Sequence, residues 1–358
     1  MRRLLIFTFL ILVTTTFSQG AIRVQQIQQI PSEPQQMLTA LTADSSGNLT
    51  ATGNNPHGAF VLKLDNSGNL IFTRSEIGSY PFGVAADTNG DVYWIGPAGT
   101  PTFPFPFTNS VLGTPPSGSL PGFVVKLHGA DGSIMWATAI GAMTPDAVAI
   151  ASDGSVVFTG VGNSTSGLTS PGAWAASTVA PAMPIEIVKL SPSGALTFAA
   201  TYGGNTTDGA APILPCQSVY LLNLASPSTQ AAAVLIDSQN HIWLTGYTNT
   251  IDLPLTSTAL KTTCACANDS FDAWLAEFSA DGSQLLHGSY LQTNSTEPDI
   301  SGSISAAAID ESGGIWFGGS TSVSPAASGA QANATGFVMR YDPSPKSELV
   351  ARGGCPRS

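Results

Sequence analysis

Charged residues are scarce in this sequence. Of its 358 residues, 10% are Asp, Glu, Lys or Arg, with 12 basic residues against 23 acidic ones. The resulting formal net charge of −11 repels phosphate backbones and anionic lipid, so we expect no nucleic-acid partner and no membrane-surface partner. Low charge combined with 43% hydrophobic residues is also unlike a disordered chain, which combines high charge with low hydrophobicity.

Long hydrophobic runs are also missing, except near the N-terminus. Residues 4–13 are apolar and follow Arg2 and Arg3, but this run is too short to span a bilayer. Ser18 and Gly20 then place small residues at the −3 and −1 positions before Ala21. We predict a secretory signal peptide at residues 1–20, with a retained membrane anchor as the alternative. Cleavage would remove two arginines, change the net charge from −11 to −13, and leave a secreted or cell-surface protein without membrane insertion.

Cysteine is equally rare. The four cysteines, which are candidates for disulfides in an oxidising compartment, are Cys216, Cys264, Cys266 and Cys355. One residue separates Cys264 from Cys266, which makes a poor pair, so we expect each to join Cys216 or Cys355. A four-thiolate zinc site is the alternative, but the C-x-x-C spacing is absent.

Patterns of catalytic residues are absent. The four histidines are His57, His128, His241 and His287, and no Ser-His-Asp constellation or G-x-S-x-G elbow accompanies them. Residues 87–91 superficially resemble a calcium loop, but the downstream bidentate Glu is missing and Asn89-Gly90 already explains them as a turn. The sequence therefore predicts no catalytic residue, no metal site and no cofactor.

What the chain has in abundance is turn residues, with 37 Gly and 25 Pro, and these recur in a repeated pattern. One turn, with Gly or Asn where a positive φ is required, occurs five times, at residues 44–48, 87–91, 151–155, 237–241 and 310–314. A second turn follows each copy, at residues 65–68, 129–132, 191–194, 279–282 and, in degraded form, 342–345. Two hairpin turns per repeat join four short strands.

The strands between these turns have the character of stacked sheets. The first strand of each repeat is small and apolar, as in Val234-Leu235-Ile236, and the second is apolar at successive positions, as in Val92-Tyr93-Trp94-Ile95. Loss of polar alternation indicates strands that are buried on both faces. We predict an all-β fold, a β-propeller of five four-stranded antiparallel blades. The expected blades are residues 37–78, 79–141, 142–204, 230–290 and 303–353, within a propeller domain at 37–358.

The segment before the first repeat also reads as a strand. Residues 21–30 have apolar side chains among glutamines, and no hairpin partner lies nearby. We expect residues 21–36 to form a closing strand and linker that pairs with the last blade, because this would remove two exposed sheet edges. A loose N-terminal arm is the alternative.

The repeats resemble those of the SBBP family, the seven-bladed β-propeller repeat proteins of bacterial cell surfaces and secretions. The resemblance rests on residues 246–256 after a second strand, on Phe123-Val124-Val125-Lys126-Leu127 and residues 337–342 in third strands, and on Thr201-Tyr202-Gly203-Gly204. It covers nearly all of residues 37–353 and implies an exported propeller without implying a defined activity. The chain departs from the family in having five repeats.

Departures from the repeat suggest where function lies. Long insertions occupy residues 96–121, 161–184, 247–271 and 321–335, between second and third strands, and residues 205–230, between two blades. All emerge on one face, where binding loops or neutral decoration are both expected. Glu186 stands where other repeats have Phe60, Phe123, Trp274 and Phe337; we expect water to reach it there, with a functional carboxylate as the alternative.

These observations favour a monomeric binding or scaffold module that contacts an extracellular glycan or protein through its insertions. The alternative is a propeller hydrolase or lyase that acts on an extracellular glycan or lactone at the central channel. The lining of the channel discriminates between the two. Acidic and histidine side chains that converge from three or more blades would favour catalysis, whereas an apolar, Ala-rich lining would favour binding.

Overall fold

The computed structural model describes strands at residues 10–11 and 27–28 and then residues 37–56, 58–76, 80–98, 108, 112, 122–141, 143–162, 168–175, 184–206, 228–264, 266, 271–291, 301–322, 335–343 and 350–352. Its regular elements over these residues are all β-strands. Over the same residues, no helix is long and apolar enough to cross a membrane.

Five four-stranded antiparallel sheets form the five blades of a propeller. Blade one contains β3 (Met37–Ala43), β4 (Leu49–Asn55), β5 (Gly58–Leu64) and β6 (Leu70–Glu76). Blade two contains β7 (Gly83–Ala86), β8 (Val92–Pro97), β9 (Gly122–Leu127) and β10 (Ile134–Ile140). Blade three contains β11 (Met143–Ile150), β12 (Val156–Gly162), β13 (Ile185–Leu190) and β14 (Leu196–Tyr202).

The last two blades repeat the same order. Blade four contains β15 (Thr229–Ile236), β16 (Ile242–Thr248), β17 (Asp272–Phe278) and β18 (Leu285–Tyr290). Blade five contains β19 (Ser301–Ile309), β20 (Ile315–Ser322), β21 (Thr335–Tyr341) and β22 (Val350–Arg352). Within each blade the strands pair in chain order, and the sequence-based prediction of five four-stranded repeats is confirmed.

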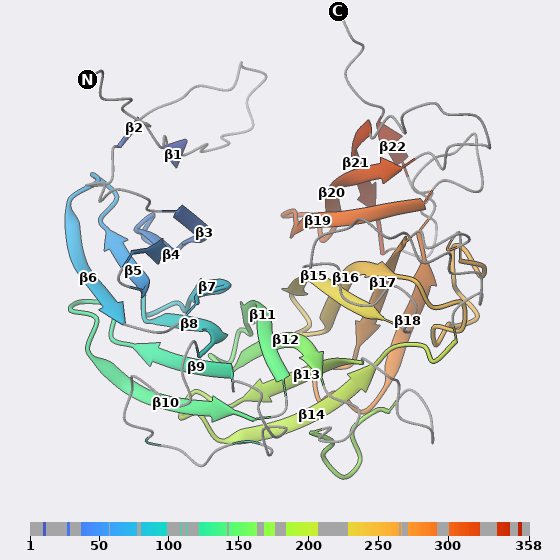
Figure 1. Cartoon of the computed structure of the whole chain (residues 1–358), viewed down its shortest axis with the longest axis horizontal. Coiled ribbons are helices and arrows are strands. Elements are labelled where there is room, and N and C mark those ends of the chain that lie inside the picture. The colour runs from blue at the N-terminus through green and yellow to red at the C-terminus, as the bar shows by residue number, and fades with distance from the viewer. Residues whose placement is uncertain are drawn as a thin grey trace, which may run out of the picture.

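Successive blades follow one another around a common axis, with the first strand of each blade innermost (Figure 1). Four of the five hydrophobic clusters lie between neighbouring blades. Between blades three and four, for example, Tyr202 and Phe278 are buried with ring centroids 5.7 Å apart. The fifth cluster belongs to blade one alone. Burial on both faces therefore explains why the second and third strands lack polar alternation.

The repeated turns have the backbone geometry that the sequence predicts. At the first turn of each blade, Gly47, Gly90, Gly154 and Gly313 have positive φ, and Asn240 takes their place in blade four with φ of 63°. The turn aspartate accepts backbone hydrogen bonds, as Asp44 Oδ1 does from the amides of Ser46 and Asn48, both at 2.9 Å. These turns define one face of the propeller, which we call the turn face. The connections from second to third strands define the opposite, insertion face.

The closing strand that we expect at residues 21–36 stays a prediction, because only residues 27–28 of this segment are described. Within the described residues, β2 (Ile27–Gln28) pairs with β1 (Leu10–Ile11) in a separate two-stranded sheet. In blade five the outermost position is held by β22, which pairs with β21.

A β-bulge recurs at one place in the innermost strands. The pairing of first and second strands shifts by one residue at Thr39 in β3, Asp146 in β11, Ala232 in β15 and Ser305 in β19. Phe82 holds the same register in blade two, since Gly83 follows it and pairs with Ile95. A bulge bends its strand and redirects one side chain.

Glycine in the second strand accommodates this bend. In blades one to four, a β-carbon on Gly53, Gly96, Gly160 or Gly246 would collide with a backbone carbonyl oxygen in the first strand or, for Gly96, in the segment that leads into it. The chain therefore needs a residue without a side chain opposite the bulge. By contrast, a β-carbon on Gly318 in β20 would meet no atom within 4 Å.

We expect Gly246→Ala to lower the free energy of unfolding by about 2–3 kcal/mol, because the new methyl group overlaps the carbonyl of Gln230. Urea denaturation followed by tryptophan fluorescence measures this loss. Gly318→Ala is the matched control and should change stability by less than about 1 kcal/mol. Equal losses in the two variants would show that the close approach at the bulge is not the constraint.

Candidate functional site

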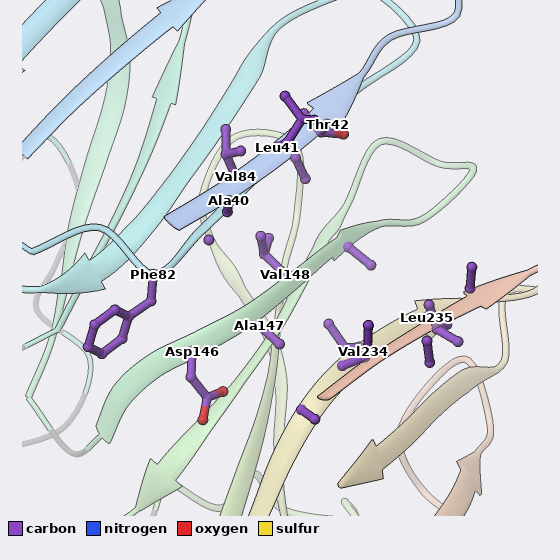
Figure 2. Close-up of a pocket in the computed structure, with 18 of the residues that line it drawn as sticks. Ala40, Leu41, Thr42, Phe82, Val84, Asp146, Ala147, Val148, Val234 and Leu235 are labelled. Carbon is purple, nitrogen blue, oxygen red and sulfur yellow. The ribbon is translucent and has the colours of Figure 1, made fainter. Parts of the chain in front are cut away.

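The five innermost strands line a central channel, which is open between blades one and five (Figure 1). Its cavity of about 690 Å³ is lined by residues 39–42, 82–86, 146–150, 232–236 and 305–309, one segment from each blade. Figure 2 shows Val84, Val148 and Val234 in this lining, together with Phe82 and Asp146. Most of the lining is Ala, Val, Leu and Ile, and Asp146 is its one carboxylate among the described residues. The channel is therefore apolar with a few isolated polar groups, which is the usual composition of a ligand site.

The bulge places five side chains at one level of the channel. We call this set the bulge ring; its members are Thr39, Phe82, Asp146, Ala232 and Ser305. Four of them lie in the half of their innermost strand that is nearer the insertion face, and Phe82 directly precedes β7 at the same end, because the first strand begins where the second strand ends. The ring thus marks the mouth of the channel on the insertion face. Its members differ from blade to blade although their backbone register is shared.

Asp146 is the ionisable member of the ring. Burial raises the pKa of its carboxyl to about 7, against smaller opposing effects of a hydrogen bond from the Thr159 hydroxyl and of the Ala147 backbone. The Thr159 Oγ1 donor lies 3.2 Å from Asp146 Oδ1. This group can therefore accept or donate a hydrogen bond near neutral pH.

Aromatic side chains from blades two and four lie near the mouth. Phe82 is 44% exposed, and Tyr80, just before it in the chain, is 54% exposed. On blade four, Tyr247 donates a hydrogen bond to Gln230 Oε1 and packs edge-to-face on Phe271, with ring centroids 5.3 Å apart. Burial raises the pKa of Tyr247, and the nearby Asp146 carboxylate adds to the effect. Exposed aromatic rings beside a single carboxyl group offer apolar faces and one polar contact.

The described parts of the insertions lie away from the channel. They run along the outermost strands: Leu112 bridges to Ile140, Ala175 to Thr201 and Lys261 to Tyr290. None of these segments contributes to the channel lining. They cover the outer edges of blades two, three and four, and covering an exposed strand edge protects it from pairing with another chain. The candidate site therefore lies on the innermost strands, and the residues of the bulge ring were not identified from sequence.

On the turn face, a cation from the third strand binds a turn carboxylate in four of the five blades. The distances are 3.0 Å for Lys63 Nζ to Asp44 Oδ2, 3.0 Å for Lys126 Nζ to Asp87 Oδ2, 3.6 Å for Lys189 Nζ to Asp153 Oδ2 and 2.9 Å for Arg340 Nε to Asp310 Oδ2. We call this recurring contact the turn-face ion pair. Lys126 also lies 3.2 Å from Asp91, so the two carboxylates of the calcium-like loop face a buried ammonium group.

Glu186 is fully buried, and our expectation that water reaches it is wrong. Strand pairing keeps the predicted register, since Glu186 pairs with Gly160 as Phe60 pairs with Gly53. Neither carboxyl oxygen has a hydrogen-bond partner of good geometry. Burial raises the pKa of this carboxyl to about 8, with the Leu168 backbone a weaker opposing influence. Glu186 does not line the channel, and its burial without a hydrogen-bond partner lowers the stability of the folded protein at neutral pH.

The four histidines have separate surroundings. His57 lies outside the described residues. His128 is exposed and 3.5 Å from Asp131 on the turn face. His287 is buried in β18, where its Nε2 has no hydrogen-bond partner and burial lowers its pKa. His241 contacts two carboxylates, Asp237 and Glu277, a grouping hidden in the sequence because Glu277 lies in a different strand.

The cysteines differ from the expected pairing where they are described. Cys264 and Cys266 are bonded to each other, with Cα atoms 5.2 Å apart. A bend in the chain brings these Cα atoms within the range of disulfides, which a fully extended chain barely allows for residues two apart. Cys216 and Cys355 lie outside the described residues.

No family model and no curated protein matches this chain in sequence. Among solved structures, it is similar to the quinohemoprotein alcohol dehydrogenase from Comamonas testosteroni, with a TM-score of 0.42, 12% identity and coverage of 88% of this chain but 43% of that one. A thermostable family-43 glycoside hydrolase gives a TM-score of 0.39 at 12% identity, over 92% of this chain and 97% of that one. The Dos1 propeller gives 0.33 at 10% identity, over 82% and 81%. Similarity at this level carries no functional argument.

The buried carboxyl of Glu186 predicts a pH-dependent loss of stability. The folded protein keeps the proton up to about pH 8, whereas the unfolded chain releases it near the ordinary glutamate pKa of 4.5. Stability should therefore fall as the pH rises from about 4.5 to about 8 and then level off. We expect Glu186→Gln to remove this component and to stabilise the protein at pH 8 by on the order of 3 kcal/mol.

Denaturant unfolding at pH 5, 6.5 and 8 measures the effect. Glu311→Gln, an exposed carboxylate in a turn, is the matched control and should leave the pH profile unchanged. If Glu186→Gln and the native protein show the same profile, Glu186 is not the group that titrates.

Proposed function

We propose that this protein is an exported, monomeric propeller that binds a neutral extracellular glycan at the channel mouth on the insertion face. The bulge ring is the observation that carries the proposal. It gathers one side chain from each of five blades at one level, including an exposed aromatic ring from Phe82 and a carboxyl group from Asp146. Sites assembled from several blades are positioned by rigid strands, which keeps their geometry fixed.

The chemistry of the mouth suits a sugar. Glycans present apolar C–H faces that pack on aromatic rings and hydroxyl groups that hydrogen-bond to carboxyl oxygens. Tyr80 and Phe82 supply the exposed rings, and Asp146 supplies the acceptor. A net charge of −11 opposes anionic ligands, so a neutral glycan is favoured over an acidic one.

Binding is favoured over hydrolysis by the number of carboxylates. Glycoside hydrolysis generally uses two Asp or Glu residues that flank the scissile bond. Among the described residues, the channel lining has Asp146 as its one carboxylate. A hydrolase or lyase remains the competing class, and release of products from a bound glycan would support it.

A glycan array followed by titration calorimetry with the best neutral oligosaccharide tests the proposal. We expect Phe82→Ala to weaken binding roughly tenfold through loss of the aromatic contact. Asp146→Asn should weaken it about fivefold, the loss for one hydrogen bond of about 1 kcal/mol. Leu70→Ala removes a comparably exposed apolar side chain from the outermost strand β6 and should leave affinity unchanged.

The proposal fails if the array detects no glycan, or if Phe82→Ala and Asp146→Asn bind as the native protein does. Circular dichroism of each variant ensures that weakened binding does not reflect unfolding. Cleavage of the bound oligosaccharide, lost in Asp146→Asn, would replace the binding function with the catalytic alternative.

A further inference from the structure

The turn-face ion pair has one exception, and it lies in blade four. The third-strand position that carries Lys63, Lys126, Lys189 and Arg340 in the other blades is occupied by Glu277. Strand pairing establishes the equivalence, because Glu277 pairs with Trp243 as Arg340 pairs with Trp316. A negative group therefore stands where four blades place a positive one, opposite the turn carboxylate of Asp237.

An imidazole completes this arrangement. His241 Nδ1 lies 2.8 Å from Glu277 Oε1 and 3.4 Å from Asp237 Oδ2. One donor atom from each of the three residues lies within 4.8 Å of the others. Their side chains are 26%, 19% and 16% exposed for His241, Asp237 and Glu277, so the cluster is accessible from solvent but partly desolvated.

Blade five provides an internal comparison. There Trp316 Nε1 donates to Asp310 Oδ2 at 2.8 Å, as Trp243 Nε1 donates to Asp237 Oδ2 at 3.1 Å in blade four. Arg340 then neutralises Asp310, and Gly314 stands at the position of His241. Blade four keeps the carboxylate and its tryptophan but replaces the cation by a carboxylate and adds an imidazole. Both changes add metal-ligating groups at one point.

The surrounding structure fixes the donor atoms. Asp237 Oδ1 accepts hydrogen bonds at 2.8 Å from the amides of Gln239 and His241, which orients the carboxylate. The same turn is anchored to blade three, since the amide and hydroxyl of Ser152 donate to Asn240 Oδ1 at 2.9 and 2.8 Å. Ligands held by outer hydrogen bonds lose little freedom when a metal binds.

We propose that Asp237, His241 and Glu277 form a site for a divalent transition metal of the Zn²⁺ class. One imidazole nitrogen and two carboxylate oxygens are a ligand set typical of zinc, with a water molecule in the fourth position. Donor atoms in a tetrahedral zinc site lie roughly 3.3 Å apart, close to the spacing of His241 Nδ1 from its two neighbours. The metal supplies the positive charge that Lys or Arg supplies in the other blades.

This site lies on the turn face, opposite the channel mouth, and was not anticipated from the sequence. Its role is to join the turn between β15 and β16 to β17, as the ion pair does in the other four blades. A protonated His241 is the competing source of positive charge, and the experiment separates the two.

Calorimetric titration of the untagged, oxidised protein with Zn²⁺ tests the proposal. We expect one Zn²⁺ per chain, a rise in melting temperature with added Zn²⁺, and at least roughly tenfold weaker binding in His241→Ala. Glu277→Lys restores the arrangement of the other blades, so it should fold and melt at least as high as the metal-free native protein while binding no Zn²⁺. His128→Ala, in an exposed His–Asp pair without a third ligand, is the matched control and should bind normally.

Two results would overturn the proposal. The first is an absence of Zn²⁺ binding by the native protein, with His241 alone then balancing the two carboxylates. The second is one-to-one binding that persists in both His241→Ala and Glu277→Lys, which would assign the metal to other residues. Because neither measurement involves a glycan, the outcome is independent of the function proposed for the channel mouth.

Discussion

Consecutive blades bury the faces that they turn toward each other, and the rest of the structure depends on this constraint. An isolated four-stranded sheet made of such apolar strands would expose both surfaces to water. Four hydrophobic clusters between consecutive blades remove that exposure. The second and third strands can therefore be apolar at successive positions, as in β9, whose six residues are all buried. A repeated sequence is the natural consequence, because every blade must fit the same kind of neighbour.

The turn face and the insertion face of the propeller have different kinds of contact. At the turn face, short hairpins bring acidic turn residues next to third-strand cations, and in blades one and two burial makes these contacts dependent on their partners. At the insertion face, the described parts of the long connections lie along the outermost strands of blades two, three and four. The innermost strands are left to line the channel, and that lining is mostly apolar.

Much of the fold could be predicted from sequence, because its signals are local. Hairpin turns are recognisable by Asp and Gly at fixed positions, and the positive φ values of Gly47, Gly90 and Asn240 agree with that prediction.

The candidate site could not be predicted in the same way. The strand that contains the bulge has no characteristic residue at that position, and the only clue was the glycine opposite it in the second strand. Glu186 was misjudged because a buried carboxyl without a partner is energetically unfavourable, yet the strand register holds it there. In the aligned third strands, Glu277 is a carboxylate where the other blades have Lys or Arg. Its significance became clear only from the position of His241.

The combination of bulge and glycine separates the backbone of the channel from its chemistry. Thr, Phe, Asp, Ala and Ser all occupy the bulge position within this one chain, while the strand opposite keeps its glycine and its course. A substitution at a bulge position therefore changes the side chain at the mouth while the backbone register of the blade is kept. Ligand specificity in such a scaffold can evolve by a change in one blade at a time, and a designer could exchange these five side chains one by one.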